Sequence, residues 1–313
     1  MVLKGFDFFP HGTRYPFIKF RNVAMIGSGV LIVASLVLFF AAGLNFGIDF
    51  RGGTLVEIQS RSGPANISDL RSKIGGLGLG DVQIQEFGAP TDVLIRVERQ
   101  PGGEKEQQQV VAKIRSALGD SVNYRRTEVV GPTVSEELKI NGTIAVLSAM
   151  LAVLIYIWFR FEWQFSVGAV AALTHDVLLT IGVFSLLQLE FNLSIIAAIL
   201  TIVGYSLNDT VVVYDRIREN LRKFKKMDLE ELLNLSINET LSRTILTSVT
   251  TLIALGALYA FGGEVIRGFT FAMIWGVVVG TYSSIFIAAP LLLMLGVKRD
   301  WSGYGGAKAK QTP

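Results

Sequence analysis

The sequence predicts a polytopic α-helical membrane protein with six transmembrane helices and one extracytoplasmic α+β domain between helices 1 and 2. Composition is the first observation: 50% of the 313 residues are hydrophobic and the mean hydropathy is +0.47, although 18% are charged. The second observation is that the apolar and charged residues are segregated along the chain, as in membrane proteins. The third is one long hydrophilic segment, residues 45–139, with the periodicities of strands and helices.

Six apolar runs approach the length of about 20 residues that a helix needs to cross about 30 Å of hydrocarbon. The first run follows a basic stretch, as the core of a signal peptide would, but it is longer than such a core and five further runs follow. We therefore expect it to remain as transmembrane helix 1, within residues 23–44. The six runs are 23–42, 140–159, 165–187, 193–214, 245–261 and 269–295.

The distribution of lysine and arginine predicts the orientation of these helices. Basic residues are concentrated before the first run, after the fourth and after the sixth, whereas the segment between the third and fourth runs has none. We therefore expect a multi-pass protein of the plasma (cell inner) membrane with both termini cytoplasmic. The expected parts are a cytoplasmic N-terminus (1–22), helix 1 (23–44), the extracytoplasmic domain (45–139), helices 2 to 6 (140–297) with a cytoplasmic loop (215–242), and a cytoplasmic tail (298–313).

The extracytoplasmic segment has the pattern of a βαββαβ, ferredoxin-like domain. Its strands alternate apolar and polar residues, and its two helices carry apolar residues at helical spacing. Asn66 or Ser68 is the expected N-cap of the first helix. The expected elements are a strand at 53–59, a helix at 67–75, strands at 82–87 and 92–98, a helix at 104–119 and a strand at 122–130.

Two local predictions concern the helices beyond this domain. Pro132 suits the first turn of a helix that runs into the second apolar run, with Thr133 or Ser135 as its cap. The segment 227–241 has apolar residues at helical spacing, and we expect it to pack on the membrane surface or on the inner face of the bundle rather than to form a partner-binding groove.

Several classes of site are excluded by composition. The chain has no cysteine and only His11 and His175, so disulfides, thiolate metal sites and histidine-rich metal sites cannot form. The net charge of +3 comes from loops that flank the membrane, which argues against nucleic-acid binding. We expect no metal, no cofactor and no enzymatic activity.

Three charged residues lie in the apolar runs. Asp176 is near the middle of the third run, Asp209 is in the cytoplasmic third of the fourth, and Arg243 is at the cytoplasmic start of the fifth. A charge at the bilayer centre costs about 2.5 to 3.5 kcal/mol on insertion scales, so such residues usually face a bundle interior and mark an ion or substrate path. Arg243 alone could instead extend its side chain to the headgroups.

Polar neighbours surround Asp209 in the sequence. Ser206 and Asn208 precede it in the same apolar run. Each adds to the cost of placing polar groups in the membrane, so both are candidates to support the Asp209 carboxylate. Asp215 and Arg216 lie where the fourth run ends. They are more typical of an interfacial charge cluster than of an ion path.

Other polar and small residues favour structural roles. We expect His175 to be a hydrogen-bonded neighbour of Asp176 rather than a proton relay. Gly276, Gly280 and Ser284 recur every fourth residue in the last run, a stripe that lets helices approach closely.

Motifs spread over nearly the whole chain resemble the SecF family, the smaller of the paired SecD and SecF subunits of the bacterial and archaeal protein-export machinery, within the resistance-nodulation-division superfamily. They are "GIDFRGGT" after the first run, "VVGPTVSEEL" before the second, "ALTHDV" in the third, "LTIVGYSLNDTVVVYDRIREN" in the fourth, "TLSRTILTSVTTL" in the fifth and "GTYSSIFIAAPLLL" in the sixth.

The resemblance implies an accessory subunit that uses the proton motive force to promote late steps of polypeptide translocation. It implies as partners SecD, the SecYEG channel, YajC or YidC, and the translocating polypeptide. The transport-linked positions of the family correspond to Asp209 and Arg243, with Asp176 a weaker candidate. A proton on Asp209 would weaken its pair with Arg243 and release a helix contact. Fused SecD–SecF proteins are about twice as long, which implies that SecD is a separate chain.

Two other functions remain open at this point. Half of a proton-driven small-molecule efflux pump belongs to the same superfamily, although such pumps usually carry larger, doubled external domains. An intramembrane aspartyl protease would use two aspartates as a dyad, but the Gly-x-Gly-Asp pattern of that class is replaced by Ser-Leu-Asn before Asp209. The residues do not distinguish protons from sodium ions.

Overall fold

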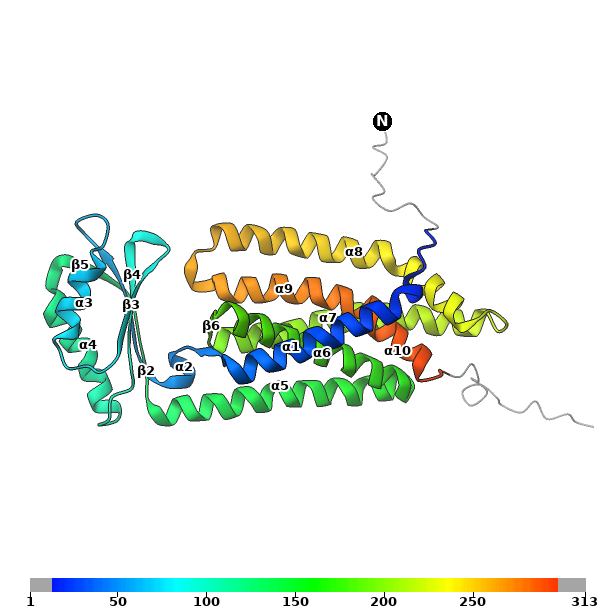
Figure 1. The fold of residues 1–313 in the computed structure, drawn as a ribbon, viewed down its shortest axis with the longest axis horizontal. Coiled ribbons are helices and arrows are strands. Elements are labelled where there is room, and N and C mark those ends of the chain that lie inside the picture. Colours follow the sequence, from blue (N-terminus) through cyan, green and yellow to red (C-terminus); the bar gives the residue numbers. More distant parts are fainter. Residues whose placement is uncertain (1–12, 298–313) are drawn as a thin grey trace, which may run out of the picture.

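The computed structural model describes residues 13–297, so the expected cytoplasmic tail and the first twelve residues lie outside it. A helical bundle carries a small α+β domain at one end (Figure 1). Within the described residues, six helices are long and apolar enough to cross a membrane, which confirms the predicted number. They are α1 (Arg21–Ala41, after the 3-10 turn Phe17–Phe20), α5 (Pro132–Arg160), α6 (Trp163–Leu187), α7 (Leu193–Lys223), α8 (Leu229–Phe261) and the segment formed by α9 (Arg267–Ser283), a π-helical turn (Ser284–Ala288) and α10 (Ala289–Met294).

The six spans divide into an inner and an outer set. In α6, α7 and the α9–α10 segment, 44% to 61% of the apolar window is buried within the chain, compared with 11% in α1, α5 and α8. The inner set pack closely because small residues line their contacts: a methyl group at Gly276 would lie 2.3 Å from Ile202, and one at Gly280 would lie 2.9 Å from Ser206. The α7–α9 contact therefore bears out the packing role expected for these two glycines.

The α+β domain is built from β2 (Gly53–Ser60), α3 (Ile67–Gly75), β3 (Val82–Phe87), β4 (Ala89–Val97), α4 (Glu104–Leu118) and β5 (Val122–Val130). Its antiparallel sheet has the strand order β3-β4-β2-β5. Both helices cover the sheet face that points away from the bundle, where Ile58, Ile95 and Ile114 form a dry core (Figure 1). The Asn66 side chain accepts a hydrogen bond from the Asp69 N–H and caps α3, which agrees with the first of the two predicted caps, Asn66 and Ser68.

The cap expected for α5 is not formed. Gly131 occupies the N-cap position and Pro132 the first helical position. Ser135 therefore lies inside the first turn, past the N-cap position, and its hydroxyl donates to the Pro132 carbonyl instead of capping the helix.

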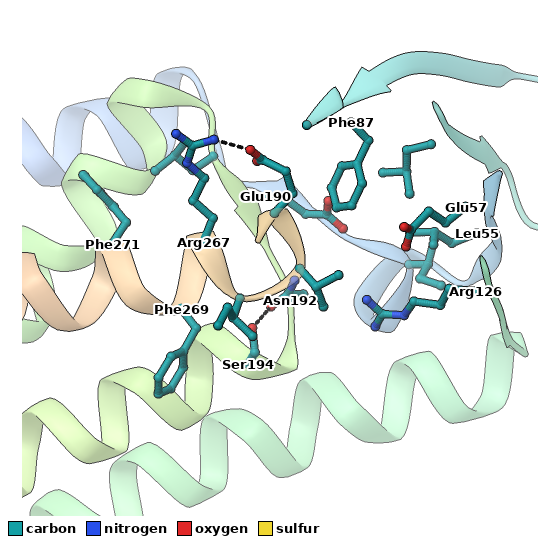
Figure 2. Close-up of a pocket in the computed structure, with 18 of the residues that line it drawn as sticks. Leu55, Glu57, Phe87, Arg126, Glu190, Asn192, Ser194, Arg267, Phe269 and Phe271 are labelled. Carbon is teal, nitrogen blue, oxygen red and sulfur yellow. Dashed lines mark hydrogen bonds and ion pairs between the residues drawn. The ribbon is translucent and has the colours of Figure 1, made fainter. Parts of the chain in front are cut away.

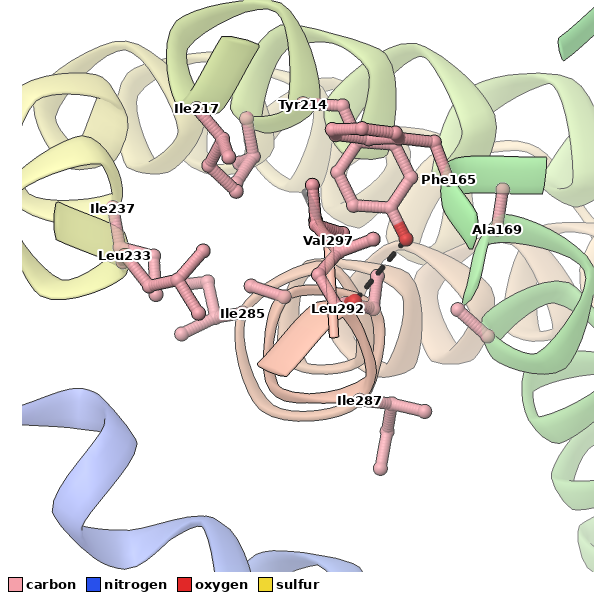
Figure 3. Close-up of a cluster of buried hydrophobic side chains, with 14 of the residues drawn as sticks. Phe165, Ala169, Tyr214, Ile217, Leu233, Ile237, Ile285, Ile287, Leu292 and Val297 are labelled. Carbon is pink, nitrogen blue, oxygen red and sulfur yellow. Dashed lines mark hydrogen bonds between the residues drawn. The ribbon is translucent and has the colours of Figure 1, made fainter. Parts of the chain in front are cut away.

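The segment expected as a cytoplasmic loop, 215–242, is almost entirely helical. The α7 helix continues to Lys223 and α8 begins at Leu229, so only a short turn joins them. Leu233 and Ile237 of α8 pack into a buried cluster with Phe165 and Tyr214, whose hydroxyl donates to the Ala288 carbonyl (Figure 3). This packing confirms the inner-face alternative predicted for 227–241, because its apolar stripe is covered by the chain itself.

Candidate functional site

Asp176 lies on α6 in the bundle interior and is only 1% exposed. One carboxylate oxygen accepts hydrogen bonds from the Ser206 hydroxyl of α7 (2.6 Å) and the Ser283 hydroxyl of α9 (2.8 Å). The other lies 2.9 Å from Nδ1 of His175. Three donors from three helices therefore satisfy this carboxylate, which is the condition for burying a charge without a large penalty.

His175 contacts Asp176 as expected, and its ring also stacks on Tyr282 with 5.9 Å between centroids. The ring is 2% exposed, and its second nitrogen, Nε2, has no hydrogen-bond partner among residues 13–297. The prediction that His175 is a hydrogen-bonded neighbour of Asp176 is thus met through Nδ1.

Asp209 lies less than one turn beyond Ser206 on α7 and is 6% exposed. In the described part of the chain it accepts one hydrogen bond within normal distance, from the Ser284 hydroxyl at 3.1 Å. The buried Thr244 hydroxyl of α8 lies near the same carboxylate but forms no hydrogen bond of normal length. Asp209 is therefore nearly as buried as Asp176 and has far fewer donors.

The two carboxylates are linked through neighbouring residues on two helices. Ser206 binds Asp176 from the same helix that carries Asp209, and the consecutive residues Ser283 and Ser284 bind Asp176 and Asp209 respectively. The π-helical turn begins at Ser284. Such turns are rare and occur frequently at functional sites, because they shift the direction of the side chains along one helix.

Arg243 does not enter the bundle interior, contrary to expectation. Its charge acts on Asp209 electrostatically, yet its side chain is exposed and no ion pair joins the two residues in the described structure. The reason is the rotation of α8, which turns Thr244 inward and Arg243 outward. Asn208, expected to support Asp209, is also exposed on α7, while Ser206 supports Asp176 instead.

The charges at the end of the fourth span form a surface network. Asp215 lies 3.4 Å from Arg160, and its side chain is 63% exposed. Arg216 donates to Glu219 at 2.6 Å and to Glu239 at 2.7 Å. This arrangement matches the interfacial cluster expected for Asp215 and Arg216 and lies apart from the two buried carboxylates.

Sequence reasoning missed Ser283 and Thr244 and assigned Ser284 to packing alone. Serine and threonine in membrane helices often bond to their own backbone, so the sequence carries no signal that separates these roles. Within residues 13–297, no group of three or more histidine, aspartate or glutamate side chains could hold a metal ion.

A junction connects this bundle to the α+β domain. The two-residue strand β1 (Asn45–Phe46) pairs in parallel with β6 (Glu190–Phe191), which immediately precedes α7. Asp49, in the short helix α2 (Ile48–Arg51), accepts the Leu193 N–H at 2.8 Å and so caps the start of α7. From the domain, Arg96 of β4 forms a 2.6 Å ion pair with Glu190.

This junction explains the glycines of "GIDFRGGT". A methyl group at Gly47 would lie 2.6 Å from the Glu190 carboxylate, and one at Gly53 would lie 2.5 Å from the Val97 carbonyl oxygen. Gly53 also has a φ of +133°, which disfavours any residue with a side chain. Gly47 therefore allows close approach of the segment after the first span to the residues before α7, and Gly53 allows close approach of β2 to β4 within the sheet.

Beside the junction is a cleft of about 990 Å³ between the uncovered sheet face and the helix ends (Figure 2). The sheet contributes Leu55, Glu57 and Phe87, and the bundle contributes Glu190 and Phe269. The cleft is lined by both apolar and charged groups, and it lies at the end of the bundle where α7 begins.

Comparison with known proteins gives two family matches in this chain. Residues 110–298 match the model described as protein export membrane protein SecD/SecF, C-terminal, and residues 37–63 match the SecD/SecF GG motif. The second range contains the glycines of the junction.

Individual relatives are similar over most of the chain. The protein translocase subunit SecF of Cereibacter sphaeroides is 48% identical, with 93% of this chain and 92% of that protein covered. The protein translocase subunit SecDF of Brucella abortus is 46% identical over 95% of this chain, which spans only 39% of that longer protein. The crystal structure of SecDF from Thermus thermophilus matches with a TM-score of 0.80 at 36% identity, covering 91% of this chain and 39% of that one.

Proposed function

Because the chain belongs to the SecD/SecF family of protein export membrane proteins, we propose that it acts as the SecF subunit of a protein translocase, in partnership with SecD. The chain corresponds to 39% of the SecDF relatives, so a SecD part supplied from outside residues 1–313 would complete the same arrangement. The efflux-pump alternative has no comparable support, since the relatives reported above are translocase subunits.

In this proposal Asp209 is the residue that responds to the proton motive force. The observation that carries the proposal is the contrast in coordination: Asp209 is buried among apolar helices with one hydrogen bond of normal length, while Asp176 has three. A carboxylate with few donors changes its charge state at smaller cost to its surroundings. Asp176 serves as the supporting site, since Ser206 and Ser283 tie it to the helices beside Asp209.

The exposed position of Arg243 supports a partner at this surface. Arg243 and Asn208 lie on the outward faces of α8 and α7, where contact with lipid would cost several kcal/mol for the charge. We assign this surface to SecD, whose helices would cover both side chains and bring Arg243 into the desolvated surroundings of Asp209. Arg243 then takes part in the response to protons at the subunit interface.

The junction would carry the response to the external domain. Leu193 and Asp209 lie on one continuous helix, about 24 Å apart at 1.5 Å per residue. A rigid shift of α7 on protonation moves its first turn, and the Asp49 cap and the Arg96–Glu190 pair pass this movement to the sheet. The cleft would then change its width, and the external domain would act on the exported polypeptide.

The remaining parts of the proposal concern location. We place both termini in the cytoplasm, as the basic residues near the first, fourth and sixth spans indicate, and the α+β domain on the opposite side of the plasma membrane. SecYEG, YajC and YidC are the proposed further partners, because export requires a channel.

The test compares two aspartates of the same helix. Asp209→Asn keeps the size of the side chain and removes its titration, so export late in translocation should fail while protein level and co-purification with SecD stay normal. Asp215→Asn is the matched control, because the Asp215 side chain lies on the same helix but is 63% exposed, and export should stay at the wild-type rate. A normal export rate for Asp209→Asn, with normal protein level, would overturn the proposal.

A further inference from the structure

The last residues of α5 and α7 lie at the end of the bundle farthest from the α+β domain (Figure 1), and they carry a cluster of basic side chains. It surrounds a cavity of about 580 Å³ where α5 ends and α7 completes its last turns. The four cations of this cavity are Arg160, Arg218, Arg222 and Lys223, and its two carboxylates are Asp215 and Glu219.

The carboxylates compensate this charge incompletely. Asp215 lies 3.4 Å from Arg160, but Glu219 is engaged at 2.6 Å by Arg216, which lies outside the cavity lining. Glu162, in the turn between α5 and α6, also interacts with Arg218 electrostatically. Among the described residues that line the cavity, positive charges therefore outnumber negative ones.

Two of the guanidinium groups share one aromatic ring. Arg160 lies 4.9 Å and Arg218 5.6 Å from the centre of the Phe161 ring, and Arg218 also donates to the Arg160 carbonyl at 3.3 Å. The two like charges interact unfavourably, and a bound anion would offset that cost. Arginine binds phosphate groups through two parallel hydrogen bonds, so this pair of side chains offers suitable contacts for one.

The surroundings point to a lipid as the source of this phosphate. Trp158, Phe159 and Trp163, next to Arg160 in the chain, are 61%, 90% and 53% exposed. Exposed tryptophans at helix ends are typical of the headgroup level of a membrane, and basic pockets there are typical of sites for anionic headgroups. The acyl chains would lie along the exposed apolar face of α5, which contains Leu151 and Ile155.

We propose that this cavity binds the phosphate headgroup of an anionic phospholipid, with Arg160, Arg218 and Arg222 as its contacts. The site lies at the opposite end of α7 from the external domain and does not depend on the proposed role of Asp209. Its occupant would hold the ends of α5 and α7 together at the membrane boundary.

Thermal unfolding of the purified protein in a neutral detergent tests the proposal. Added phosphatidylglycerol should raise the Tm by roughly 3 °C, whereas phosphatidylcholine and inorganic phosphate at the same concentration should not. The double variant Arg218→Gln with Arg222→Gln should lose this rise. Lys225→Gln with Lys226→Gln is the matched control, because it removes the same charge just beyond the cavity and should keep the rise.

Each alternative outcome is decisive. An equal rise with phosphatidylcholine would overturn the proposal, as would an equal rise with inorganic phosphate, which would mark a free-anion site. Equal loss in both double variants would show unspecific attraction of charge and would overturn it too. If the Arg218 and Arg222 double variant cannot be purified, Arg160→Gln removes a half-exposed contact of the same cavity, and retention of the full rise in that variant would contradict the site.

Discussion

Asp176 and Asp209 are both carboxylates in the bundle interior, but their surroundings differ. Asp176 is 1% exposed and contacts His175, Ser206 and Ser283, whereas Asp209 is 6% exposed and has a single hydrogen bond of normal length, from Ser284. Burial alone therefore does not distinguish a structural charge from one that can change state. In the proposed function the number of donors makes this distinction, because each donor that holds a carboxylate raises the cost of neutralising it.

Removing the carboxylate of Asp176 should have the largest effect on stability. Asp176→Ala leaves the Ser206 and Ser283 hydroxyls and His175 Nδ1 without their partner in the buried interior, and each unsatisfied group costs about 1 to 3 kcal/mol. We expect a much lower Tm in detergent and little assembled protein. Asp176→Asn, which keeps the shape, should lose less. If the Tm of the alanine variant equals that of wild type within error, the claim that Asp176 is held more firmly than Asp209 is wrong.

The consecutive serines offer a sharper comparison. Ser283→Ala removes a 2.8 Å bond to Asp176 and should cost about 2 kcal/mol, as for a hydrogen bond to a charged group. Ser284→Ala removes the longer 3.1 Å bond to Asp209 and should cost about 1 kcal/mol or less. Thermal unfolding of both variants under identical conditions measures the difference. Equal losses would mean that the two carboxylates are held alike.

Arg243→Lys should affect export without affecting stability. Lysine keeps the positive charge but lacks the planar group that fixes a carboxylate in one geometry. Since Arg243 is exposed on this chain, the Tm of the isolated protein should not change. Gradient-dependent export should fall roughly fivefold, equivalent to about 1 kcal/mol. A wild-type export rate for Arg243→Lys would contradict the proposed part of Arg243 in the response to protons.

The smallest expected effect concerns the junction. Arg96→Gln and Glu190→Gln each leave one partner of a mostly buried pair and should cost about 1 kcal/mol in stability, with slower export. The exchanged variant, Arg96→Glu with Glu190→Arg, restores opposite charges and should recover part of the export rate. Normal export in both single variants, or slow export that the exchanged variant does not improve, would show that the pair does not transmit movement.

Much of this architecture could be predicted from the sequence because its signals are local. Hydropathy marked the six spans. The local pattern marked the strand 122–130, and helical spacing with an N-cap residue marked the helix 67–75, both with the bounds that the structure shows. Asp176 and Asp209 were visible because a carboxylate inside an apolar run is costly.

The rest depended on helix rotation and on contacts between distant segments. Arg243 and Thr244 are consecutive residues, so they point about 100° apart around the axis of α8. Tertiary packing decides which of them faces Asp209, and the sequence pattern does not. Ser284 was interpreted as a packing residue and Ser283 was missed, because serine suits both close packing and hydrogen bonding. The sequence pattern cannot show that Gly47 leaves room for the Glu190 carboxylate, because Glu190 lies more than 140 residues later in the chain.

The most direct test of the account is export into membrane vesicles in which the proton and sodium gradients are imposed separately, with wild type and Asp209→Asn compared. The account predicts that a proton gradient accelerates completion of export in wild type and that a sodium gradient alone does not. It predicts that Asp209→Asn, inserted at wild-type level and bound to SecD, responds to neither gradient. Acceleration of Asp209→Asn by the proton gradient to the wild-type extent would contradict the central claim that Asp209 is the proton-responsive group.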